Sequence, residues 1–130
     1  MIHVDATLQG NCNTGLLIAM LATDCHGTLL TADDVSRITY SIWENVPEGS
    51  NLLTPNLDHT AVSVDISSLI SPPAEYVCEE LDTPTRYNFL HKVSATVSLP
   101  FPRRNSTYIL EYLFYDTANE PHACTVSVQT

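Results

Sequence analysis

The chain has 130 residues, the usual length of one domain, so the sequence predicts a single domain spanning residues 1–130. Only 15% of the residues are charged, and five Lys and Arg against fifteen Asp and Glu give a formal net charge of -10. Such a surface repels phosphate, which excludes direct nucleic-acid binding, because that binding depends on Lys and Arg to neutralise the backbone.

Strand signals dominate the first part of the chain. Residues 2–8 and 37–44 alternate between apolar and polar side chains, which predicts strands with one dry and one wet face. Residues 16–24 begin with a continuous apolar run that fits a helix or a buried strand, and its short length between turn residues favours the strand. The run is far below the roughly 20 residues that cross a bilayer, so we expect no membrane partner. Residues 31–35 predict one helical turn with a threonine cap.

The middle of the chain predicts a short strand followed by a brief helix. Residues 61–64 fit the strand, and Asp65 is placed to cap a helix over residues 66–70. Pro72 and Pro73 should end that helix, because proline removes a backbone donor and clashes with the preceding turn.

The last third predicts three more strands, over residues 86–93, 107–115 and 122–128, of which the second has the strongest signal. Pro100 and Pro102 exclude a central strand between them. Several short strands separated by turns predict an all-β fold, an antiparallel immunoglobulin-like β-sandwich with one or two short helical turns.

The cysteines give no sign of a metal site. No CxxC pair occurs among Cys12, Cys25, Cys78 and Cys124, so we expect neither zinc nor another metal. No secretory signal is visible at the N-terminus, so we expect all four thiols to be reduced. Cys124 alternates in step with two valines and is interpreted as a small buried side chain.

No spacing of reactive side chains indicates an enzyme. The sequence has neither a nucleophile-elbow motif nor a glycine-rich phosphate loop, so we expect no catalytic residue and no cofactor. His91 shares a strand face with Phe89 and is interpreted as a core residue. His26 and His59 lie at predicted turns, where we expect solvated side chains.

Binding surfaces give a clearer signal. Residues 108, 110, 112 and 114 form an apolar row that predicts core, yet the opposite row, 109 to 115, is also too apolar for open water. A second part of the chain or another protein is expected to cover that row. Trp43 faces away from the apolar row of its own strand and fits either a lid on the core or an interface anchor. The protein-interface candidates are Trp43, Leu52, Leu53, Ile109, Leu113 and Tyr115.

Two blocks of sequence carry a resemblance. The first is Thr39-Tyr40-Ser41-Ile42-Trp43 after residues 30–35, and the second joins residues 86–91, Pro100-Phe101-Pro102 and residues 107–114. In this order they resemble small uncharacterised proteins encoded among the virion genes of tailed bacteriophages and prophage-like clusters, over residues 15–128. Those proteins often carry a glycine pair where Arg103 and Arg104 stand here, and polar residues at positions 109 and 113.

The resemblance implies a structural virion protein, and capsid decoration or cementing is the leading expectation. A neck, connector or tail component of the virion is the first alternative. An immunoglobulin-like adhesion or carbohydrate-binding module is the second. The expected partners are the major capsid protein or other virion proteins, contacted as a homo-oligomer or in many copies, and the expected location is the virion, assembled in the host cytoplasm.

Overall fold

The computed structural model describes residues 2–7, 16–24, 26–45, 53–76, 85–93 and 106–129. Its strands and short 3₁₀ turns, in chain order, are β1 (Ile2–Thr7), β2 (Leu16–Met20), β3 (Val35–Asn45), β4 (Leu53–Pro55), η1 (Leu57–His59), β5 (Val62–Val64), η2 (Ile66–Ser68), β6 (Leu69–Tyr76), β7 (Thr85–Val93), β8 (Thr107–Asp116) and β9 (Pro121–Gln129).

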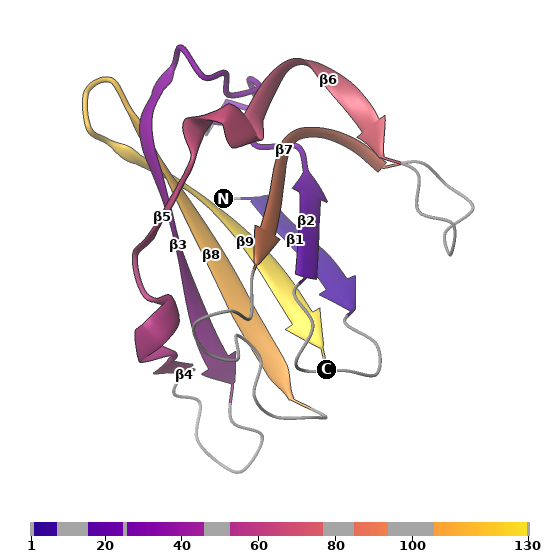
Figure 1. Ribbon diagram of the computed structural model, residues 1–130, viewed down its shortest axis with the longest axis vertical. Helices are drawn as coiled ribbons and strands as arrows, with labels where there is room; N and C mark the ends of the chain where they lie inside the picture. The colour runs from indigo at the N-terminus through magenta and orange to yellow at the C-terminus, as the bar shows by residue number, and fades with distance from the viewer. Residues whose placement is uncertain are drawn as a thin grey trace.

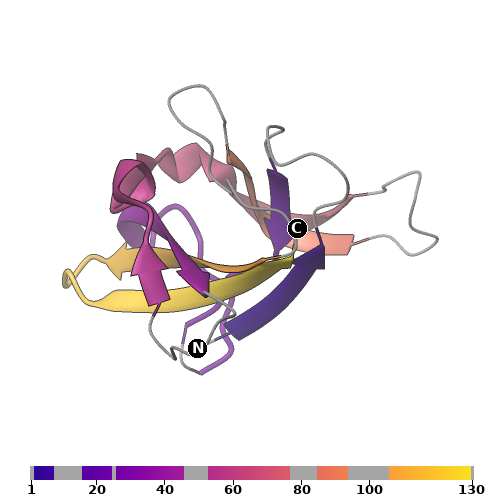
Figure 2. The ribbon, with the colours of Figure 1, turned by 90° about the horizontal axis from the view of Figure 1, so that it is seen from below.

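These strands form two sheets, and the fold is an all-β sandwich, as the sequence predicts (Figure 1). The large sheet has the order β1-β9-β8-β3-β4, with β5 also paired to β3, and the small sheet has the order β2-β7-β6. Figure 2 shows the small sheet lying over one face of the large sheet. The core therefore lies between the two layers.

Pairing is antiparallel throughout the described sheets except at one edge, where β1 runs parallel to β9. The sandwich is thus mostly antiparallel, as the sequence predicts, with one parallel pair at this edge. Alternation of apolar and polar residues predicts a strand but carries no information about its direction, which depends on how the chain connects distant strands.

Aromatic side chains join the two sheets. Every even-numbered residue from Tyr108 to Phe114 on β8 is buried, and so are Tyr40 and Ile42 on β3. Phe89 of β7 meets the rings of Tyr112 and Phe114 edge-on, with centroids 4.9 and 5.1 Å away. Edge-to-face contacts of this kind add to the free energy gained from burial, so Phe89 anchors the small sheet on the large one.

The predicted helical turn at residues 31–35 is a hydrogen-bonded turn instead. The amide of Asp34 donates to the carbonyl of Thr31 over 3.0 Å, and the Thr31 hydroxyl donates to Asp34 Oδ2 over 2.9 Å. Val35 already belongs to β3, whose pairing with β8 ends any helix at this point.

The predicted cap at Asp65 is present, but the helix after it is shorter than expected. The amide of Ser67 donates to Asp65 Oδ1 over 2.9 Å, and the turn ends at Ser68. Pro72 and Pro73 lie within β6 rather than ending a helix. Because β6 is the edge strand of the small sheet and its register slips between Leu69 and Ala74, prolines are tolerated there.

Candidate functional site

One face of the large sheet points away from the small sheet. Along β8 the even-numbered side chains enter the core, so the odd-numbered ones project from the opposite face. Strand register then defines what we call the outer face, which includes Arg37, Thr39, Ser41, Trp43, Ile109, Glu111, Leu113, Tyr115, Pro121, Ala123, Thr125 and Ser127.

Four of the six predicted interface residues share this outer face. The register pairs Trp43 with Ile109, while Leu113 lies opposite Thr39 and Tyr115 opposite Arg37. All four are partly exposed. Two distant segments of sequence therefore contribute to one apolar strip along β3 and β8.

The other two candidates are placed less fully. The backbone of Leu53 lies on β4, opposite Asn45 of β3. Leu52 lies outside the described residues.

Part of the outer face is buried. Thr39 and Thr125 are only 7% and 8% exposed although they lie on this face. Among the described residues, one large apolar side chain is mostly exposed. It is Leu57 of η1, at 82%. The strip is thus a partly covered surface rather than a loose set of projecting side chains.

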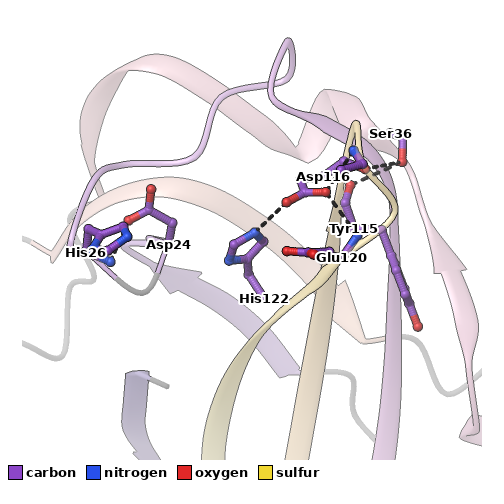
Figure 3. A network of polar contacts seen from close by, with 8 residues as sticks. Asp24, His26, Ser36, Tyr115, Asp116, Glu120 and His122 are labelled. Atoms are coloured by element: carbon purple, nitrogen blue, oxygen red, sulfur yellow. Dashed lines mark hydrogen bonds and ion pairs between the residues drawn. The ribbon is translucent and has the colours of Figure 1, made fainter.

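Arg37 fixes one end of the strip. Its guanidinium carbon lies 3.7 Å from the centroid of the Tyr115 ring, a cation–π contact. The Ser36 hydroxyl lies 3.2 Å from the carbonyl of Tyr115 and 3.1 Å from that of Asp116, and donates toward both (Figure 3). These contacts hold the end of β8 against the start of β3.

The tight turn between β8 and β9 depends on Asp116. Its Oδ1 accepts hydrogen bonds from the amides of Ala118 and Glu120, and its Oδ2 lies 3.0 Å from Nε2 of His122 (Figure 3). The Glu120 amide, followed by His122, lowers the pKa of the Asp116 carboxyl below its usual value. The turn also places Asn119 at a φ of 63°, in the left-handed region that asparagine tolerates.

A second aspartate near this end organises another turn. Asp24 Oδ1 accepts from the amides of His26 and Thr28, and the bond from Thr28 contributes most to lowering the Asp24 pKa. Both carboxylates therefore serve their own turns. The described residues contain no group of three His, Cys, Asp or Glu side chains arranged to hold a metal ion.

Two histidine–tyrosine pairs lie between the sheets. The Tyr40 hydroxyl is 2.8 Å from His59 Nδ1, and His91 Nδ1 is 2.8 Å from the Tyr112 hydroxyl. The rings of Tyr40 and His91 are 5.2 Å apart, so the pairs form one cluster. Burial lowers the pKa of His91 to about 4 and raises that of the Tyr112 hydroxyl well above its usual value. The His91 imidazole and the Tyr112 hydroxyl are thus neutral polar groups of the core at pH 7.

His59 corrects one expectation. It is 3% exposed rather than solvated, because η1 folds it onto Tyr40 of β3. His26 is exposed, as expected at a turn. His91 is partly buried beside Phe89, in keeping with its interpretation as a core residue.

Asn88 is a structural residue that sequence reasoning missed. It is 1% exposed on β7, and its side chain accepts from the amide of Ala22 and donates to the carbonyls of Ala22 and Leu30. The only sequence signal was an amide side chain next to Phe89 inside a strand. Asn88 thus fastens the segment between β2 and β3 to the small sheet.

Cys124 is a free, fully buried thiol, and its burial raises its pKa. It occupies the small buried position predicted for it. The remaining cysteines, Cys12, Cys25 and Cys78, lie outside the described residues.

No helix in the described part of the chain is long and apolar enough to cross a lipid bilayer. Comparison with protein-family models, curated proteins and solved structures finds no match to this chain.

Proposed function

We propose that this chain is a structural protein of a tailed-bacteriophage virion, a capsid decoration or cement protein that docks on other virion proteins through its outer face. The observation that carries the proposal is the shared position of Trp43, Ile109, Leu113 and Tyr115 on one sheet face. Partly exposed apolar and aromatic groups gathered on one face of a small domain are typical of protein interfaces.

Charge and side-chain chemistry support a binding role on the outside of a particle. A net charge of -10 suits a protein that stays clear of packaged DNA. The titratable side chains that form networks are used by the fold, Asp116 and Asp24 in turns and His91 in the core. These groups support a protein that works by contact rather than by reaction.

The test begins with purified particles of the phage or induced prophage that encodes the chain. Quantitative mass spectrometry should find the protein at a fixed number of copies per particle, and its absence from particles would overturn the proposal. Electron cryomicroscopy of the same particles separates a capsid position from the neck and tail.

A double variant then tests the outer face. Leu113→Ser with Tyr115→Ser should fold, as judged by circular dichroism, but incorporate at least about tenfold less, because interface anchors dominate binding energy. The matched control is Leu90→Ser with Tyr87→Ser on β7, which changes the same residue types at partly exposed positions of the small sheet. Normal incorporation of a folded Leu113/Tyr115 variant would place the docking surface elsewhere.

A further inference from the structure

A single carboxylate lies in the middle of the apolar strip. Glu111 projects from β8 between Ile109 and Leu113, and its register neighbours are Ser41 on β3 and Thr125 on β9. It is partly exposed, and within the described residues its carboxylate makes no hydrogen bond or ion pair. A charged group thus sits where a docking partner would cover it.

The described cations do not compensate this charge. Arg37 shares the outer face, but its guanidinium is stacked on Tyr115, at the end of the strip rather than beside Glu111. Arg86 and Lys92 belong to β7 in the small sheet. Covering a carboxylate that has no partner is strongly unfavourable, so a docking protein that supplies a positive group to Glu111 fits this face best.

The negative charge of Glu111 favours some docking partners of the outer face over others. A two-fold dimer whose axis passes through the middle of this face would bring Glu111 against Glu111 of the second copy. The net charge of -10 adds repulsion between copies and disfavours an anionic membrane as well.

We infer that the outer face binds a different protein, one that presents an apolar strip with a Lys or Arg positioned to pair with Glu111. This inference rests on the proposed docking function and specifies its partner. Glu111 then acts as the specificity determinant of the surface, while Trp43, Ile109, Leu113 and Tyr115 supply the apolar contact. Glu111 attracts a basic side chain of the partner at this position and repels an acidic one.

The test uses the full chain incorporated into particles, with Glu111→Gln, Glu111→Lys and the control Glu75→Lys. Glu75 is exposed on β6, so its variant makes the same charge change on the other sheet. Glu111→Gln should lower the number of copies per particle about tenfold and Glu111→Lys about a hundredfold or more, while Glu75→Lys stays at the wild-type level. Circular dichroism should show all three variants folded.

The outcomes separate this inference from the proposed function. Absence of the wild-type chain from particles refutes the function itself. A second outcome is that the wild type incorporates, the Leu113→Ser and Tyr115→Ser double variant does not, and Glu111→Lys incorporates normally. That result overturns the inference about Glu111 but leaves the proposed docking function standing. Sedimentation should show the purified wild-type chain as a monomer. A dimer that is altered by Glu111→Lys would show that a second copy occupies the face, and would also overturn the inference.

Discussion

Asn88 shows how one buried side chain can hold an irregular segment against a sheet. The segment between β2 and β3 has a short bridge between Thr23 and Leu29 and a bond from the Leu30 amide to the Ala22 carbonyl. Two more backbone bonds close its turn, from the amide of Asp24 to the carbonyl of Thr28 and from the amide of Gly27 to the carbonyl of Asp24. The Asn88 side chain makes three hydrogen bonds to the backbone of this segment, at 2.6, 2.9 and 3.0 Å. Its amide carries both the acceptor and the two donors that these groups need.

We expect Asn88→Ala to lower the free energy of unfolding by about 2–4 kcal/mol, because it removes the side chain that pairs with the Ala22 amide and the Leu30 carbonyl. The matched control Asn45→Ala, at an exposed position of β3, should change it by less than about 0.5 kcal/mol. Urea denaturation followed by fluorescence measures both. A loss below about 1 kcal/mol for Asn88→Ala would mean that water replaces the amide without penalty.

At the scale of elements, alternation was a reliable guide to the long strands. The period-two pattern predicted β3, β7, β8 and β9 and correctly assigned the buried row of β8. It also predicted that Trp43 faces away from the core row of β3. It could not show that Trp43 pairs with Ile109, because register between distant strands is set by the turn geometry and by packing across the whole sheet.

Two predictions, for the prolines of β6 and for His59, are wrong for identifiable physical reasons. The prolines of β6 indicate the end of a helix in the sequence, because sequence alone does not reveal that this strand lies at an edge of its sheet. His59 was expected in water because its neighbours are polar, whereas its burial depends on Tyr40, nineteen positions away. Long-range partners of polar side chains leave almost no mark in a single sequence.

The packing of β7 on β3 and β8 should be sensitive to acid. His91 of β7 faces Tyr40 of β3 and Tyr112 of β8, and its folded-state pKa is about 4. The imidazole of an unfolded chain titrates near 6.5. Between these values the unfolded chain binds a proton that the folded chain does not, so stability is unaffected above about pH 6.5 and falls as the pH decreases toward about 4.

We expect this effect to cost about 1–2 kcal/mol between pH 7 and pH 4.5, after allowing for solvent screening of a partly exposed ring. Urea denaturation at the two pH values should show a smaller loss for His91→Gln than for the wild type. His26→Gln, at an exposed turn, should behave like the wild type. Equal losses for the wild type and His91→Gln would show that this imidazole does not govern acid stability.

At the scale of the whole molecule, the size of the outer face indicates how it would be used. Strands β3, β8 and β9 contain 11, 10 and 9 residues. With strands about 4.8 Å apart and residues about 3.3 Å apart, their shared face covers roughly 400 Å². A stable interface buries about 800 Å² on each partner, so a contact through this face alone would be weak. Stable attachment would then require further contacts or many copies held on a lattice.

We propose that a partner covers the outer face in the assembled particle. Hydroxyl-radical footprinting tests it without any substitution, by comparing side-chain labelling in the free chain and in purified particles. We expect labelling of Trp43 and Tyr115 to fall severalfold on assembly, while Tyr87 of β7 in the small sheet keeps its free-chain rate. Unchanged labelling of Trp43 and Tyr115, or protection of Tyr87 alone, would show that the partner does not cover the outer face.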